Sequence, residues 1–201
     1  MPNWCTTSYV ITGDKKTLRL FNRKLSQLRN RKGSLIPNGF GKLWCGNVAY
    51  LLGEKDPAHF SCRGEINEFT LSPDGLRLDV SVMSAWVELS ELRKLVQEKY
   101  PDVSIFFISE EPGCCVYETN DHAGEVFPEK FILEWFEDSK SGEFLTGYFK
   151  SLDEASEFIF ENILDGKPIG KTRKEIIATL DAYQESHPGV SYIFEEFSIV
   201  D

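Results

Sequence analysis

The stretch INEFTLSPDGLRLDVSV, residues 66–82, decides the fold of this chain. Its first part, residues 66–71, mixes apolar and polar side chains and leads to Asp74-Gly75, a dipeptide typical of tight turns between strands. After the turn, leucine and valine alternate with polar residues over 76–82, which is the period of a strand with one buried face. The stretch therefore predicts an antiparallel hairpin.

A strand and a helix are expected upstream of this hairpin. Residues 5–12 alternate, with one side more apolar than the other, and Gly13 ends that pattern. Asp14 is placed to cap a helix over about 15–31. The apolar residues of that helix recur at helical spacing and are expected to be buried: Leu18, Phe21, Leu25 and Leu28.

A helix and a strand are expected downstream. Apolar residues at helical spacing predict a helix over about 87–99, and Pro101 marks its end. Residues 103–108 are apolar on both faces, which is typical of a strand in the middle of a sheet. A turn over 110–113 then leads into an added strand at 114–118. Residues 1–120 therefore predict a ferredoxin-like β-α-β-β-α-β sheet, in an α+β fold.

Glycine and proline interrupt the segment between the first helix and the hairpin. Residues 33–64 contain six glycines and two prolines, so we predict a long loop insertion with one short strand at 48–52. Loops of this length are usually functional or mobile.

The last part of the chain, residues 121–201, has a different order of elements. Its expected segments are a hairpin over 131–136 and 144–149, helices starting after Ser151 and Thr172, and a strand over 190–200. Glutamate follows each capping residue three positions later, at Glu154 and Glu175, which favours these helix starts. We expect an acidic ββααβ extension or small second domain that packs on the first part or extends its sheet.

Several segments of the first part resemble one known family. They are Met1-Pro2-Asn3-Trp4-Cys5, Gly13-Asp14, Met83-Ser84-Ala85-Trp86, Tyr100-Pro101-Asp102 and Glu110-Glu111-Pro112-Gly113. Together they resemble the YubB ferredoxin-like domain family over about residues 1–120. The resemblance implies the ferredoxin-like fold and no established catalytic residues. Val87-Glu88-Leu89 departs from the family pattern, in which small residues and proline often follow the tryptophan.

Length and composition narrow the class of protein. The chain has 201 residues, 41% of them hydrophobic and 27% charged, which is typical of a globular protein and excludes collagen, coiled-coil and disordered classes. The sequence contains neither a signal peptide pattern nor an apolar run long enough to span a bilayer, so we expect a cytoplasmic protein without a membrane partner.

Metal, cofactor and catalytic patterns are sparse. The five cysteines contain no Cys-x-x-Cys pair, and we expect reduced, mainly buried thiols, no metal and no cofactor. Cys114 and Cys115 on one strand would point to opposite faces. An enzyme would need a pocket in which Glu110, Glu111, Cys115 or His122 converge, and the residues favour a chain that is not an enzyme.

The strongest functional signal is the distribution of charge. The whole chain carries a net charge of −10, but residues 1–100 hold 15 basic and 10 acidic side chains while residues 101–201 hold 7 and 22. The first helix carries a basic face that repels itself at i, i+4 spacing, which favours a compensating partner. The alternative is a solvated face that the acidic half of the same chain partly neutralises. The candidate binding residues are Lys16, Arg19, Arg23, Arg29 and Trp44.

The leading hypothesis is a non-enzymatic binding module that mediates protein–protein interaction through this helix and the insertion. Three alternatives stay open: binding of a nucleic-acid backbone by the basic helix, mimicry of nucleic acid by the acidic C-terminal carboxylates, and an enzyme with an unrecognised site. The oligomeric state is left open by the residues.

Overall fold

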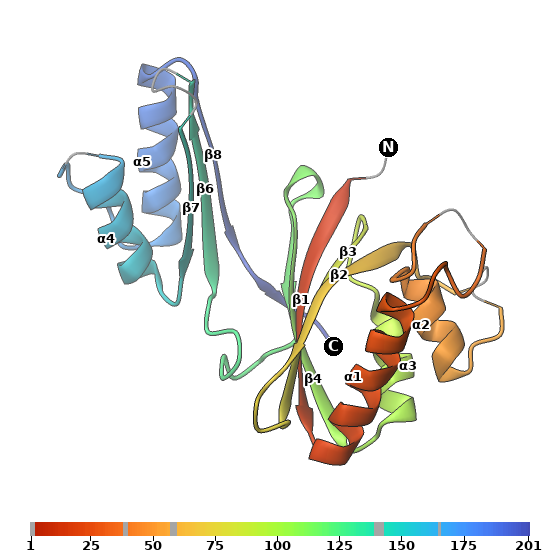
Figure 1. Ribbon diagram of the computed structural model, residues 1–201. Coiled ribbons are helices and arrows are strands. Elements are labelled where there is room, and N and C mark those ends of the chain that lie inside the picture. Colours follow the sequence, from red (N-terminus) through yellow and green to blue (C-terminus); the bar gives the residue numbers. More distant parts are fainter. Residues whose placement is uncertain (1–2, 38–39, 57–59, 139–142, 165) are drawn as a thin grey trace. The chain divides into compact units, whose positions relative to one another are not determined.

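The computed structural model describes residues 3–37, 40–56, 60–138, 143–164 and 166–201 (Figure 1). These residues form two compact units. The first is Met1–Asp121 together with Val200–Asp201, and the second is His122–Ile199. Met1 and Pro2, which open the segment that resembles the YubB family, lie outside the described residues.

The first unit contains a mainly antiparallel sheet and three α-helices. In chain order these are β1 (Trp4–Gly13), α1 (Lys15–Arg29), α2 (Cys45–Leu52), β2 (Gly64–Leu71), β3 (Arg77–Ala85), α3 (Ser90–Lys99), β4 (Val103–Glu111), the short 3-10 helix η1 (Pro112–Cys114) and β5 (Val116–Thr119). Within this unit the sheet order is β2-β3-β1-β4-β5, and β9 (Ser198–Ile199) comes directly before the residues Val200–Asp201 that belong to the unit. Strands β1 to β5 pair antiparallel, and the predicted hairpin is confirmed as β2 and β3.

The alternation in β1 decides which face of this sheet is buried. Tyr9 and Ile11 pair with Val80 and Leu78 of β3, and all four point to the face that α1 and α3 cover in Figure 1. The buried stripe of α1 is the expected one: Leu18, Phe21, Leu25 and Leu28. Burial of these apolar side chains against the sheet is the main stabilising contribution to the unit.

The expected loop insertion contains a helix instead of a strand at 48–52. This helix, α2, ends at Gly53, whose φ of 112° is in the left-handed region typical of a helix C-terminus. Its Asn47 is fully buried, and the Asn47 side chain forms hydrogen bonds to the segment that precedes the helix. The Asn47 Oδ1 accepts from the backbone N–H of Ile36 at 3.0 Å, and Nδ2 donates to the Ser34 hydroxyl at 2.8 Å and to the Gly41 carbonyl at 3.1 Å. The helix forms because its apolar side and Asn47 are buried together.

The core of the first unit contains a buried polar network. The Tyr9 hydroxyl donates to Glu88 Oε1 at 2.8 Å, and Arg93 Nε donates to the same oxygen at 3.1 Å. The Arg93 guanidinium lies 4.8 Å from the ring centroid of Phe107, and its Nη2 donates to the Asp201 carbonyl at 2.9 Å. Each charge in this network is paired, as burial requires.

The second unit is a three-stranded antiparallel sheet with two helices on one face. Its elements are β6 (Phe131–Glu137), β7 (Glu143–Phe149), α4 (Leu152–Asn162), α5 (Arg173–Ser186) and β8 (Val190–Glu196), and the sheet order is β7-β6-β8. Both predicted helix starts are confirmed. The Ser151 side chain accepts from the Glu154 N–H at 3.2 Å, and Thr172 with Glu175 forms a reciprocal capping box.

The fold class is α+β, with five α-helices among the described residues. None of these helices is long and apolar enough to cross a membrane.

Candidate functional site

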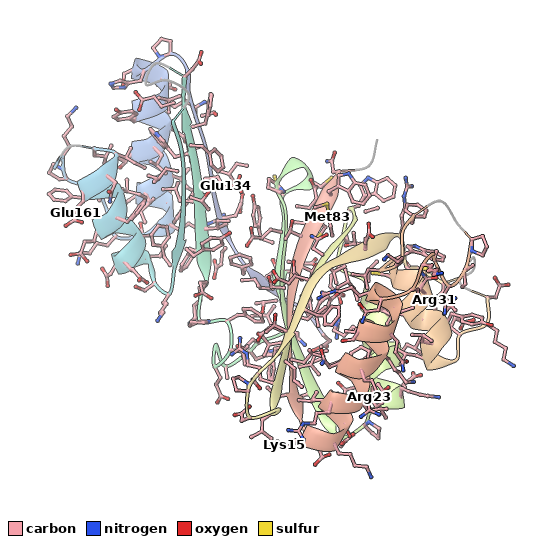
Figure 2. All side chains as sticks on the ribbon, in the orientation of Figure 1. Lys15, Arg23, Arg31, Met83, Glu134 and Glu161 are labelled. Atoms are coloured by element: carbon pink, nitrogen blue, oxygen red, sulfur yellow. The ribbon has the colours of Figure 1, made fainter. Side chains whose placement is uncertain are left out.

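The exposed side of α1 is the candidate binding surface. The Asp14 side chain caps this helix by accepting from the N–H groups of Lys16 at 2.8 Å and Thr17 at 3.2 Å. Because the apolar stripe faces the sheet, the basic residues between its members face solvent. Figure 2 labels Lys15 near the start of the helix, Arg23 further along it and Arg31 beyond its end.

Four basic side chains meet around one hollow on this surface. The hollow has a volume of about 540 Å³ and is lined by Asp14, Lys15, Lys16, Arg19, Leu20 and Arg23. Lys15, Arg19 and Arg23 follow each other at i, i+4 spacing, so they form one basic row along the helix. We name this hollow with its lining the α1 basic surface.

The tip of the hairpin borders the α1 basic surface. A Cβ atom on Gly75 would lie 3.2 Å from side-chain carbons of Lys15, so glycine lets the turn approach the helix. The Ser72 hydroxyl donates to Asp74 at 2.6 Å. Hydrogen bonds from this hydroxyl and from the Leu76 N–H, with the nearby Lys15 charge, lower the pKa of Asp74.

The other two predicted binding residues lie elsewhere. The Arg29 guanidinium carbon is 3.7 Å from the ring centroid of Phe69, a cation–π contact outside the hollow. Trp44 is only 9% exposed, belongs to the hydrophobic core and stacks on Phe40. We therefore exclude Trp44 from the exposed surface, although the sequence placed it in a loop.

Lys24 of α1 donates to the Leu51 carbonyl at 3.3 Å, a hydrogen bond that connects α1 to α2.

Asp14 lines the same hollow and Asp74 lies near Lys15, but neither forms an ion pair with the basic row among the residues that the structure describes. None of the ion pairs found there includes Lys16, Arg19 or Arg23. Their mutual repulsion along the helix is therefore not offset by a neighbouring carboxylate at ion-pair distance.

A second cluster lies at one end of the sheet, and the sequence did not single it out as a site. Three of the segments that carry the family resemblance meet there, around Asn3, Trp86 and Glu111. The Trp86 N–H donates to the Asn3 carbonyl at 3.0 Å, and Trp4 pairs with Ala85 across β1 and β3. Trp86 has a φ of 69°, which is unusual for a bulky residue and costs backbone strain.

Side chains of this cluster also surround an exposed thiol. Asn3 Nδ2 donates to Cys114 Sγ at 3.4 Å, and Glu111 Oε1 accepts from the Gly113 N–H at 3.0 Å. Burial raises the pKa of Glu111, but hydrogen bonds from the Cys114 thiol and from backbone N–H groups outweigh it and lower the pKa overall. The hydrogen bond to Glu111 raises the pKa of Cys114 in turn.

The remaining chemical candidates are not brought together. Glu110 and Glu111 are neighbours on β4 and point to opposite faces of the sheet, while His122 belongs to the second unit. Within the described residues, no group of three or more histidine, cysteine, aspartate or glutamate side chains is arranged to hold a metal ion.

Comparison with known proteins adds no relative. No protein-family model matches the chain, and neither the curated proteins nor the solved structures contain a match.

Proposed function

We propose that this chain is a non-enzymatic binding module whose α1 basic surface binds an acidic segment of a partner protein. The observation that carries the proposal is the row of cations around one hollow, which lacks ion-pair partners among the described residues. An acidic ligand would relieve the repulsion along the helix and complement the local field.

Leu20 favours a protein segment over a nucleic-acid backbone. This side chain lines the hollow and is 44% exposed, with Lys16 one turn before it and Arg23 nearly one turn after it. A phosphate backbone offers no apolar group that would bury the Leu20 side chain. An acidic peptide that contains an apolar residue can bury Leu20 against that residue.

We further infer that the first unit has the ferredoxin-like arrangement and is related to the YubB family. The antiparallel order β2-β3-β1-β4, with α1 and α3 on one face, supports the ferredoxin-like part. The convergence of Asn3, Trp86 and Glu111 at one end of the sheet supports the relation, because it gives the segments of the resemblance a shared structural role.

The test is a titration of fluorescently labelled peptide into the full chain, followed by anisotropy. The probe is a glutamate-rich peptide that contains leucine. Arg19→Glu combined with Arg23→Glu should weaken binding about tenfold or more, since each reversed charge removes an attraction and adds a repulsion. Leu20→Ser should weaken binding of the same peptide about threefold, because it removes an apolar contact.

A matched control places the same change of charge on α3 of the same unit, as Lys94→Glu with Lys99→Glu, where both side chains are exposed. This control should leave the affinity nearly unchanged. Equal weakening by both double variants, or none by either, would overturn the proposal. Tighter binding of a DNA duplex than of the peptide, with a steep salt dependence and no effect of Leu20→Ser, would show nucleic-acid binding instead.

A further inference from the structure

We propose that Cys114 and Cys115 form a vicinal dithiol site that binds one soft, thiophilic centre, of the chemical class of trivalent arsenic compounds, through both sulfur atoms. This site goes beyond the proposed function, because it does not involve the α1 basic surface and takes a different class of ligand.

Exposure separates this pair from the other cysteines. Cys114 and Cys115 are both exposed, whereas Cys5, Cys45 and Cys62 are buried. Burial raises the pKa of Cys62 to about 11 and raises the pKa of Cys45 further. Mainly buried thiols were expected from the sequence, and for these two residues that expectation is wrong. A reagent in solution therefore meets the adjacent pair first.

The backbone at the pair differs from the strand that the sequence predicts. Cys114 ends the 3-10 helix η1, and β5 begins only at Val116. Cys115 has a φ of 53° and a ψ of 42°, which is the left-handed region. The alternation that would send the two side chains to opposite faces of a strand therefore does not apply. The Cys115 thiol also contributes to the raised pKa of Cys114, after the larger effect of Glu111, so the two groups are electrostatic neighbours.

Local geometry favours a bridging atom over a direct disulfide. The described peptide bonds are all trans, so the two Cα atoms are separated by about 3.8 Å, below the range of roughly 4.4–6.8 Å that is usual for disulfides. A direct bond would therefore be strained. A thiophilic atom with bonds of about 2.3 Å to each sulfur, as for zinc and thiolate, holds the sulfurs further apart and avoids that strain.

Neighbouring groups hold Cys114 in place. Its sulfur accepts from Asn3 Nδ2 at 3.4 Å, and the neighbouring Glu111 carboxylate raises its pKa. A Cβ atom on Gly113 would lie 2.6 Å from Asn3 Nδ2, so a larger residue there would displace the Asn3 side chain from Cys114. The site is thus built from the start of β1 and the turn after β4.

The binding step balances without an oxidant. An organic arsenoxide, R–As=O, reacts with the two thiols, so that both bonds between arsenic and oxygen are replaced by two arsenic–sulfur bonds. The two thiol protons leave with the oxygen as one water molecule. Arsenic stays trivalent and both sulfurs keep their oxidation state.

Phenylarsine oxide is the probe, and intact-mass spectrometry of the full, reduced chain is the measurement. One adduct should form and should persist in excess 2-mercaptoethanol, while 2,3-dimercaptopropanol should remove it. Cys114→Ser and Cys115→Ser should each weaken retention against the monothiol at least a hundredfold, because the second sulfur then no longer binds intramolecularly. Both residues are exposed, so these variants should fold, which circular dichroism checks.

Cys62→Ser is the matched control, since Cys62 is buried and should not contribute. Retention in this variant should equal that of the unaltered chain. The proposal is overturned if the monothiol removes the adduct from the unaltered chain as readily as from the single variants. An adduct that survives in either single variant, or that depends on Cys62, also overturns it.

Discussion

At the scale of single residues, Glu111 controls the chemistry of Cys114. The hydrogen bond from the thiol to this carboxylate stabilises the protonated thiol, and the negative charge disfavours a thiolate beside it. Cys114 is therefore exposed and yet slow as a simple nucleophile near neutral pH, because the thiolate is the reactive form. An exposed thiol with a raised pKa is a poor catalytic nucleophile, but it can still bind a thiophilic atom together with a second thiol.

Glu111→Gln should speed alkylation of Cys114 by iodoacetamide, measured in a Cys115→Ser background. The amide still accepts from the Gly113 N–H but carries no charge, so the pKa of Cys114 falls toward its ordinary value. The raised pKa keeps the thiol protonated as pH rises, and its removal should move the whole pH–rate profile to lower pH. A profile that moves to higher pH, or stays in place, contradicts this assignment.

At the scale of elements, the Trp44 ring determines which residue can occupy one position in α2. Gly46 lies in its first turn, and a Cβ atom there would lie 2.3 Å from the Trp44 ring. The buried indole therefore packs directly on the helix backbone. Glycine is a poor helix former, and this close contact gives the reason for its presence at the position.

Gly46→Ala should destabilise the chain by about 1–3 kcal/mol, because the added methyl displaces a buried ring. Helix propensity alone would give the opposite sign, a gain of about 1 kcal/mol. Urea denaturation followed by tryptophan fluorescence measures the free energy of unfolding. Gly33→Ala is the control, since a Cβ atom there has no neighbour within 4 Å among the described residues, and its effect should be small. A stabilising Gly46→Ala would contradict the packing argument.

At the scale of the whole molecule, the last residues of the sequence belong to the first unit. The Val200 N–H donates to the Thr119 carbonyl at 2.9 Å, and its side chain packs against the first core. Asp201 accepts from Arg93, which joins it to the buried network with Glu88 and Tyr9. The unit is therefore discontinuous in sequence, and its stability depends on residues about 80 positions beyond its main segment.

Val200→Ser should lower the unfolding free energy of the first unit by about 1 kcal/mol, because it removes a partly buried apolar side chain. Amide hydrogen exchange in β1 and β4 measures this unit specifically. The neighbouring Ile199 is 48% exposed, so Ile199→Ser should change the same amides by less than about 0.5 kcal/mol. Equal effects of the two substitutions would contradict the placement of Val200 in the core.

Elements with strong local patterns are predictable from the amino-acid sequence alone. Alternation predicted the strands around the Asp74-Gly75 turn, Asp14 and Thr172 predicted helix starts, and the spacing of apolar residues predicted the buried side of the first helix. These patterns depend on residues that are close in sequence, so they can be recognised without knowledge of the tertiary structure.

Only the tertiary structure decided the features that depend on distant partners. The helix α2 was missed because it is short and lies among glycines and prolines, and its buried Asn47 is satisfied by a loop that forms around it. Trp44 is buried because its ring packs against the backbone of α2 at Gly46 and joins the hydrophobic core, which its position in the sequence does not indicate. The meeting of Asn3 with Cys114, and of Val200 with Thr119, joins residues far apart in sequence, which periodicity and capping patterns cannot specify because both act locally.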